Sequence, residues 1–417
     1  MYAKLFKEKR FSWGGRALVA KFPAHGAVSV VGSIAGGSRA ARSGELADVH
    51  AQMLLEGTKR RDKRALQTAL DDMGASLEFS VTESRLLWSG KVLAHNLEKF
   101  LALVGEILLE PAFSTTELAI LQSRERANLA HEAQDTREQA MIALTRLLYK
   151  KGHPNRAEST EESRRALKKI TKQKLEAFHK KILGRKTLVL SVAGDAAPAR
   201  VFSPAQRYFS ELPDHGYAHT PPPKPPLPKP AYQKVFVPHK ANIDYYVGLA
   251  AGITSDHPDY VALMLGVSVL GIPGFTGRMM KTIREREGLT YVVYAYMSGF
   301  ERVVDGAITM WGTFAPQLFA RGREAIAREV RKVVDEGVSE EEAKKFRELI
   351  FNKTRVQMSN SMAFAKAAHA VAAEGRPLAY LDEFPQRVLK TTRLAINRAL
   401  KKYLNPAKLA EAAAGPV

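Results

Sequence analysis

The feature that most constrains the fold of this chain is a run of prolines near its middle. Residues 221–230 read PPPKPPLPKP. Proline fixes its φ angle and lacks a backbone N–H, so such a run favours an extended polyproline conformation and cannot join a packed helix or a central strand. We therefore interpret residues 211–232 as a proline-rich linker, which separates halves of about 210 and 190 residues.

The two halves on either side of this linker resemble each other in the order of their patterns. Each has a strand and then a helix, at residues 28–35 and 44–55 in the first half and at 243–251 and 258–270 in the second. Each continues with two further strands, a long helix and a Ser-x-x-Glu capping box, which begins at Ser114 and at Ser339. Because the spacing between matched features is nearly constant, we infer a duplicated unit.

The succession of strands and helices predicts the fold class. Runs of strands followed by runs of helices are typical of α+β proteins. We expect two homologous domains, residues 1–210 and 233–417, each a mostly antiparallel sheet with helices packed on one face and joined by the linker at 211–232. Hydrophobic residues make up 45% of the chain, which is enough for cores of this size.

Composition and charge narrow the classes of function. The chain contains no cysteine, which excludes disulfides and thiolate metal sites. We find no signal-peptide pattern and no apolar run that could span a membrane, so we expect a cytoplasmic location without membrane contact, with the periplasm left open. The net charge is +20, yet no nucleic-acid-binding motif accompanies it. We interpret the charge as a solvated basic surface that can steer an acidic partner.

One helical segment carries a resemblance to a known family. Glu45–Thr58 reads ELADVHAQMLLEGT and follows a strand and a glycine-rich turn. Here the chain resembles the insulinase (pitrilysin) family of zinc peptidases, in which this helix carries the inverted zinc motif H-x-x-E-H before an apolar run and Gly-Thr. The two histidines of that motif bind zinc, and the glutamate beside the second one polarises the attacking water.

The resemblance implies that the zinc motif of this chain is degenerate. Asp48 stands in place of the first histidine, Ala51 in place of the glutamate and Gln52 in place of the second histidine. Alanine has no carboxylate, and glutamine is a poor zinc ligand compared with imidazole, so we expect this chain to bind no metal. His50 points about 200° away from Asp48 around the helix, and we interpret it as an ordinary helix histidine. A weak oxygen-ligand cation site at Asp48 and Gln52 stays an alternative.

A second helix carries the counterpart of the family's third zinc ligand, which follows a pattern like E-R-x-x-x-x-x-E. Glu125, Arg126 and Glu132 match this pattern within SRERANLAHE. Seven residues are two helical turns, so both carboxylates face the same way. The resemblance implies that Glu132 corresponds to the third ligand and Glu125 to its neighbour. Without the family context, such a pair also fits a solvated helix face.

The second half carries the strongest part of the resemblance, GFTGRMMKTIREREGLTY at residues 274–291. It is similar to the family's second-domain motif, a glycine-rich turn and a helix followed by R-E-x-x-G-L-x-Y. Arg284 and Tyr291 match the arginine and tyrosine that the family brings to its active centre. The implied role is to hold the substrate and to stabilise the oxyanion, which suits a permanent charge and an orientable hydroxyl.

This asymmetry implies a division of labour between two chains. The zinc half is degenerate and the Arg/Tyr half is intact, as in the non-zinc subunit of a heterodimeric peptidase of this family. We expect such a chain to be inactive alone and to pair with an insulinase-family chain of similar length, whose intact motif supplies zinc for the cleavage of peptide substrates. The alternative is a scaffold subunit without a proteolytic role, like the core proteins of respiratory complexes.

Overall fold

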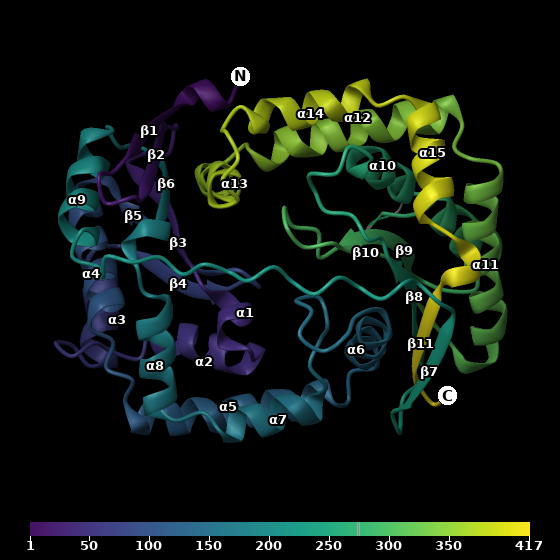
Figure 1. Cartoon of the computed structure of the whole chain (residues 1–417), viewed down its shortest axis with the longest axis horizontal. Coiled ribbons are helices and arrows are strands. Elements are labelled where there is room, and N and C mark those ends of the chain that lie inside the picture. Colours follow the sequence, from purple (N-terminus) through teal and green to yellow (C-terminus); the bar gives the residue numbers. More distant parts are fainter. Residues whose placement is uncertain (273, 275) are drawn as a thin grey trace. The chain divides into compact units, whose positions relative to one another are not determined.

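The computed structural model describes residues 1–272, 274 and 276–417, and the chain forms two compact units (Figure 1). Unit 1 contains Met1–Ala127, Ser163–Thr220 and Lys353–Phe384, and unit 2 contains Asn128–Glu162, Pro221–Asn352 and Pro385–Val417. Each unit therefore includes a stretch from the other half of the sequence. The predicted domains at 1–210 and 233–417 describe the duplicated halves, and their boundaries stay a prediction.

Unit 1 is built on a six-stranded sheet with the strand order β1-β2-β6-β3-β5-β4. Its strands are β1 (Phe6–Arg10), β2 (Arg16–Lys21), β3 (Ala27–Ala35), β4 (Ser76–Val81), β5 (Arg85–Leu93) and β6 (Val189–Gly194). Only β2 and β6 run parallel, and every other neighbouring pair is antiparallel. Along β5 the buried Leu86, Trp88 and Val92 alternate with more exposed residues, which is the period of a strand with one face in a core.

Unit 2 repeats this topology in a five-stranded sheet with the order β7-β11-β8-β10-β9. Its strands are β7 (Ala231–Phe236), β8 (Ile243–Ala250), β9 (Val293–Ser298), β10 (Ala307–Phe314) and β11 (Ala410–Gly415). The pair β7 and β11 is parallel, as β2 and β6 are, and the other pairs are antiparallel. The strands match β2-β6-β3-β5-β4 one for one, which confirms the predicted α+β class and the duplicated, mostly antiparallel sheets.

Helices from the same half of the sequence cover one face of each sheet. In unit 1, α4 (Leu97–Leu109) and α9 (Ala199–Phe209) pack beside β5, where the rings of Trp88 and Phe209 lie 6.2 Å apart. In unit 2, α10 (Tyr260–Leu270), α11 (Phe319–Asp335) and α15 (Arg393–Tyr403) take the corresponding places. Among the described residues, no helix is both long enough and apolar enough to cross a membrane.

The remaining helices connect these layers. They are α1 (Gly37–Ala41), α2 (Gly44–Met53), α3 (Lys63–Asp72), α5 (Thr115–Glu132), α6 (Thr136–Leu148), α7 (Thr160–Lys168), α8 (Lys172–Ile182), α12 (Glu340–Gln357), α13 (Ser361–Ala373) and α14 (Tyr380–Lys390). Residues 217–230, which include the proline run, form neither helix nor strand, as the lack of proline N–H groups predicts.

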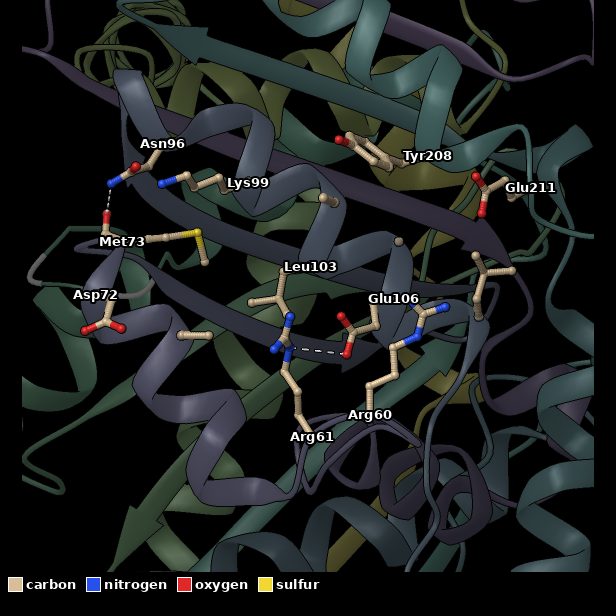
Figure 2. A pocket seen from close by; sticks show the side chains of 14 residues that line it. Arg60, Arg61, Asp72, Met73, Asn96, Lys99, Leu103, Glu106, Tyr208 and Glu211 are labelled. Carbon is tan, nitrogen blue, oxygen red and sulfur yellow. Dashed lines mark hydrogen bonds and ion pairs between the residues drawn. The ribbon is translucent and has the colours of Figure 1, made fainter.

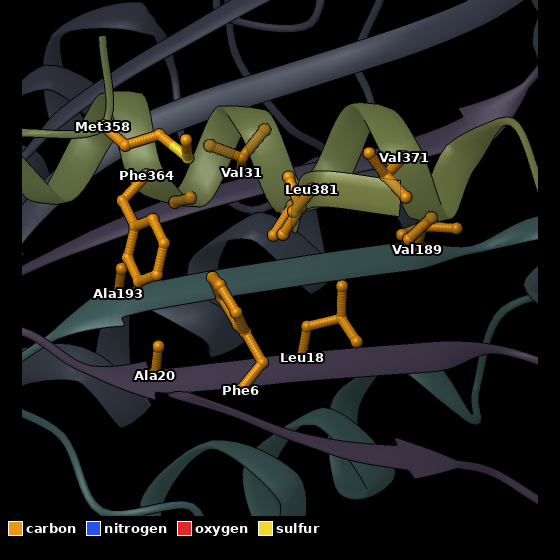
Figure 3. Close-up of a cluster of buried hydrophobic side chains, with 13 residues drawn as sticks. Phe6, Leu18, Ala20, Val31, Val189, Ala193, Met358, Phe364, Val371 and Leu381 are labelled. Carbon is orange, nitrogen blue, oxygen red and sulfur yellow. The ribbon is translucent and has the colours of Figure 1, made fainter. Parts of the chain in front are cut away.

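The second face of each sheet is covered by a helix from the other half of the sequence. Alternation along β3 places Gly32 toward Trp88 and Ser33 on the opposite face, where the Ser33 hydroxyl lies 2.8 Å from His369 Nε2 of α13. Figure 3 shows α13 over β2, β3 and β6, with the Phe364 ring 4.6 Å from that of Phe6. The predicted helices on one face of the sheet are therefore joined by a helix on the second face. The sequence pattern within each half does not predict this second covering helix.

In unit 2 the corresponding helix is α6, from the first half of the sequence. Thr136, at its first residue, donates a hydrogen bond of 2.6 Å to Asp244 of β8, and Trp311 Nε1 donates one of 2.8 Å to the same carboxylate. The Arg137 guanidinium lies 4.0 Å from the centre of the Trp311 ring, a cation–π contact. The α6 side of this sheet is rich in alanine on β11, which lets the helix approach closely.

The covering of sheet 1 by α13 can be tested by removing its central aromatic ring. Phe364 is 1% exposed and packs in one cluster with residues of β1, β2, β3 and β6. Phe364→Ala should lower the free energy of unfolding by about 3–5 kcal/mol, because it leaves a cavity. Val356→Ala in α12, at a side chain that is 68% exposed, should change it by less than about 0.5 kcal/mol. Urea unfolding followed by circular dichroism measures both, and equal effects would contradict this account.

Candidate functional site

The predicted zinc-motif positions lie on α2, and each presents a different environment. Asp48 is exposed, Ala51 is 2% exposed, and Gln52 is half-buried. The helix buries its opposite side, including Ala47 and His50. The spacing of Asp48 and Gln52 therefore places both side chains on one face, as the sequence predicts, while the position between them offers only a methyl group.

A guanidinium approaches Gln52 from α5. Arg124 Nη2 donates a hydrogen bond of 2.5 Å to Gln52 Oε1, and Arg124 Nε lies 3.7 Å from the carboxylate of Glu125. The amide oxygen that could have served as a metal ligand is therefore engaged by a cation. The positive charge of Arg124 beside this oxygen also disfavours the binding of a cation there, because like charges repel.

These side chains do not fit a zinc ion. A zinc site needs three protein ligands of suitable geometry, usually imidazole, thiolate or carboxylate. Ala51 provides no donor atom, and Gln52 already binds Arg124. In the part of the chain that the structure describes, no group of three His, Cys, Asp or Glu side chains is arranged to hold a metal ion.

The predicted acidic pair lies on α5, with Glu125 and Glu132 two turns apart. The Glu125 side chain is 18% exposed and lies beside Arg124. Glu132 is exposed at the last residue of the helix, and its backbone carbonyl accepts a hydrogen bond from the Gln139 side chain at 3.0 Å. Glu125 belongs to unit 1 and Glu132 to unit 2. What the structure establishes for this pair is that both side chains lie on the same face of α5.

His50 is more than an ordinary helix histidine, because it forms a buried pair with His179 of α8. His50 Nε2 lies 2.9 Å from His179 Nδ1, and His179 Nε2 lies 2.8 Å from the carbonyl oxygen of Leu108, near the end of α4. Since only an N–H can bond that carbonyl, His179 Nδ1 must accept a hydrogen from His50. The rings of Phe113 and Phe178 enclose the pair.

Burial keeps both rings of this pair neutral. The pKa of His50 lies well below 6.5 because of burial and then because of the neighbouring His179, and burial lowers the pKa of His179 to about 4. The sequence does contain a signal for the pair, which the spacing of His50 from Asp48 does not reveal. Each histidine lies in the apolar stripe of its helix, His50 between Ala47 and Leu54, and His179 among Leu175, Phe178 and Ile182.

Arg284 and Tyr291 lie together in unit 2. The Arg284 guanidinium is 4.7 Å from the centre of the Tyr291 ring, and the Tyr291 side chain is 74% exposed. The cation–π contact holds a permanent charge and a phenol hydroxyl side by side at the surface of the unit. The structure therefore brings together the two residues that the sequence motif predicts to act jointly.

Local sequence explains how these two residues meet. Arg284 lies on η4 (Met280–Arg286), a π-helical turn anchored by the buried Met280 and Ile283. Gly288 has a φ of 62°, a left-handed conformation that favours glycine and reverses the chain after the helix. The Thr290 hydroxyl then donates to the carbonyl oxygen of Thr313 on β10, which fixes the segment just before Tyr291. In the preceding GIPGFTG turn, Pro273 and Phe275 lie outside the described residues.

Unit 1 also contains a cavity of about 590 Å³ between α3, α4 and the end of α9 (Figure 2). Figure 2 shows the Arg61 guanidinium directed to the Glu106 carboxylate, 3.3 Å away, and the Asn96 amide directed to the backbone of Met73. None of the predicted site residues lines this cavity. Arg60 and Arg61 of its lining are paired with Glu110 and Glu106. We therefore keep the candidate functional positions on α2 and at η4.

Comparison with known proteins shows the family. Residues 19–159 match the model of the insulinase family (peptidase family M16), and residues 169–350 match the model of the peptidase M16 inactive domain. Together the two matches span well over half of the chain. The chain belongs to the insulinase family.

Relatives within the insulinase family cover most of the chain at low identity. An uncharacterized zinc protease of Rickettsia felis is 23% identical over an alignment of 360 residues that covers 81% of this chain and 79% of that protein. The non-peptidase homologue YmxG of Helicobacter pylori is 25% identical over 307 residues, 72% of this chain and 69% of that one. The chain is thus similar both to a protein named as a protease and to one named as a non-peptidase.

Solved structures extend the likeness of this insulinase-family chain to the whole fold. The peptidase M16 inactive domain of Pseudomonas fluorescens superposes with a TM-score of 0.89 at 22% identity, covering 99% of this chain and 98% of that one. A protease of Helicobacter pylori superposes with a TM-score of 0.83 at 16% identity, covering 99% of both chains. The match to the peptidase M16 inactive domain makes the chain an inactive-type member of the family.

The misfit at α2 predicts that the purified chain holds no stoichiometric zinc. After incubation with zinc and dialysis, elemental analysis should find less than about 0.1 zinc per chain, since Ala51 offers no donor and Arg124 engages Gln52. A chain with one zinc that is lost in the Asp48→Ala/Gln52→Ala double variant would overturn this conclusion.

The buried histidines predict how stability depends on pH. The pKa values of His50, His179 and His369 are lowered in the folded protein, the last to about 3 because of burial and the nearby Arg85 charge. Below pH ~6.5 the unfolded chain therefore binds more protons than the folded protein does. The contribution of these histidines to the free energy of unfolding is complete above that pH and falls toward pH 4. Each histidine lowers it by up to about 1.4 kcal/mol for every pH unit.

Urea unfolding at several pH values measures this slope. A His50→Leu/His179→Leu double variant should lose a large part of the slope and keep the part that comes from His369 and from the half-buried His219, whose pKa burial also lowers. His95→Ala, at an exposed position, should keep all of it. An unchanged slope in the double variant would show that the pair is not the source.

Proposed function

We propose that this chain is the non-catalytic subunit of a heterodimeric zinc metallopeptidase that degrades or processes peptides. The observation that carries the proposal is the juxtaposition of Arg284 and Tyr291, 4.7 Å apart, with Tyr291 74% exposed. Arg284 lies on a π-helical turn, and π-helical segments occur frequently at functional sites. Membership of the insulinase family supports peptide-bond hydrolysis as the reaction class of this proposal.

The chemistry of the two side chains suits the hydrolysis of a peptide bond. When water attacks a peptide carbonyl, negative charge develops on its oxygen. The Tyr291 hydroxyl can donate to that oxygen, and Arg284 adds a charge that stays positive at any working pH. Donors that are fixed before the reaction stabilise the oxyanion more than mobile water does. We therefore assign both residues to transition-state stabilisation.

The remaining chemistry must come from another chain. Water activation needs a metal ion and a carboxylate base, and α2 offers Asp48, Ala51 and Gln52 in their places. We infer that an insulinase-family partner of similar length with an intact H-x-x-E-H motif supplies the zinc, the base and the water. This chain then contributes Arg284, Tyr291 and part of the wall around the substrate, and it is inactive by itself.

A scaffold role without proteolysis is the competing function. The absence of suitable zinc ligands on α2 is equally compatible with a scaffold role, because a scaffold needs no metal. It gives no reason, however, for a tyrosine that is 74% exposed and held by an arginine. The two functions therefore predict different effects on peptide cleavage when Arg284 or Tyr291 is substituted within the assembled complex.

The proposal predicts a loss of activity when either side chain is truncated. The chain is mixed with an intact-motif insulinase chain from the same genome, and cleavage of a quenched fluorescent peptide is measured. Arg284→Ala and Tyr291→Phe should each lower kcat/KM of the complex about 10²- to 10³-fold, the effect of removing one oxyanion donor. Arg286→Ala, an exposed neighbour on η4, should change it less than about twofold.

The controls separate a chemical role from a structural one. Size-exclusion chromatography should show that all three variants still assemble with the partner. Each chain alone should cleave the peptide no faster than buffer does. If the complex cleaves equally well with Tyr291→Phe and Arg284→Ala, or if the mixture is inactive although assembled, the scaffold role replaces the proposed one.

A further inference from the structure

The two sheets differ at one edge. In unit 1, β2 pairs with β6 on one side and with β1 on the other. In unit 2 the counterpart of β2 is β7, which pairs with β11 in the same parallel manner. Within the described ranges no strand occupies the outer side of β7. The duplicated fold thus has a strand position that is filled in one unit and open in the other.

Backbone directions show what the open position presents. Val237 N–H donates to Gly415 O at 2.9 Å, which places the N–H groups of odd-numbered residues toward β11. Because successive peptide groups in a strand point to opposite sides, the N–H and C=O groups of Tyr232, Lys234 and Phe236 point to the outer edge. An edge of this kind is a template for another strand.

The same reasoning applied to β2 shows how such an edge is completed. Arg16 N–H donates to Leu188 O at 2.9 Å, so Ala17 and Val19 direct their backbone groups away from β6. These residues stand opposite Lys9 and Lys7 of the antiparallel β1. The chain therefore contains, within itself, the geometry that a sixth strand would adopt on β7.

The side chains of β7 leave its edge accessible. Tyr232 is 40% exposed and Phe236 is 69% exposed, whereas Ala17 and Val19 of β2 are at most 1% exposed. Apart from the charge of Lys234, this open edge therefore carries exposed aromatic side chains, and an exposed apolar edge strand is a site at which another strand can pair. On the other face, Ala231 and Val235 lie against the apolar cluster beneath α6, next to which a further apolar residue can pack.

Charge around the edge selects the kind of strand that fits. Residues 215–243 contain lysines at 224, 229, 234 and 240 and no acidic residue. The nearby Arg323 lies 4.8 Å from the centre of the Tyr232 ring and is neutralised by Glu411 at 2.5 Å, so among the described residues Lys234 is the exposed, uncompensated charge of β7 itself. A second copy of β7 would bring lysine toward lysine, and the basic β1 of another copy, FKEKR, would meet the same repulsion. An acidic strand is favoured instead.

We propose that the outer edge of β7 binds an extended acidic segment of a partner polypeptide as a sixth, antiparallel strand. Its apolar residues pack beside Ala231 and Val235, and an acidic residue stands opposite Lys234. The backbone groups of Tyr232, Lys234 and Phe236 supply the hydrogen bonds. This inference does not depend on the peptidase-subunit proposal, because it concerns an edge that holds none of the residues assigned to the reaction.

A proline substitution tests the backbone bonds directly. Lys234→Pro removes the outward N–H of residue 234 but none of the bonds to β11, and Lys234→Ala removes the same charge and keeps the N–H. The probe is a short fluorescent peptide in which valine and glutamate alternate, followed by fluorescence anisotropy. Lys234→Ala should weaken binding a few-fold, and Lys234→Pro should weaken it at least about tenfold further. Circular dichroism and thermal unfolding check that both variants fold.

A charge reversal provides an independent test should the proline variant fail to fold. Lys234→Glu keeps the backbone edge and should exchange the preference, so that a valine–lysine peptide binds better than the valine–glutamate peptide. Equal affinities of Lys234→Pro and Lys234→Ala would overturn the proposal. So would a Lys234→Glu variant that still prefers the acidic peptide, since the site would then lie elsewhere.

Discussion

Each sheet of this protein depends on a helix from the other half of the sequence to bury one of its faces. Without α13, residues such as Leu18, Val31 and Val189 would face water, and without α6 so would Tyr246 and Trp311. Burial of apolar area at roughly 25 cal/mol per Å² is the largest stabilising contribution available to such faces. The hydrogen bonds of Ser33 to α13 and of Thr136 to β8 then fix the position of each helix.

Local signals predicted most elements, because period-two and period-3.6 patterns depend on neighbours in the sequence. The strands at 28–35 and 243–251 and the capping box of Ser339 and Glu342 are present as expected. The exchange of α6 and α13 could not be predicted in this way. Periodicity shows that a helix has an apolar face, but the identity of the sheet that receives this face depends on contacts such as Ser33 with His369, 336 residues apart.

The site shows the same division between local and distant information. Sequence placed Asp48 and Gln52 on one helix face, and the turn at Gly288 brings Tyr291 back to Arg284 as the motif suggests. The contact of Arg124 with Gln52 joins residues of two helices that are 72 positions apart in the sequence, so no spacing rule could reveal it. For His50, its spacing from Asp48 does not indicate its role. Its position in the apolar stripe of the helix does, because it predicts that the side chain is buried.

The exchange of helices between the halves also determines at what point during synthesis each sheet can be covered on both faces. A ribosome releases the strands of sheet 1 long before α13, which begins at Ser361. Until then the face with Val31 stays uncovered, and contacts of such separation form slowly. The emerging first half is therefore the stage most exposed to aggregation and to chaperones. Neither half of the sequence therefore contains every helix that covers its own sheet.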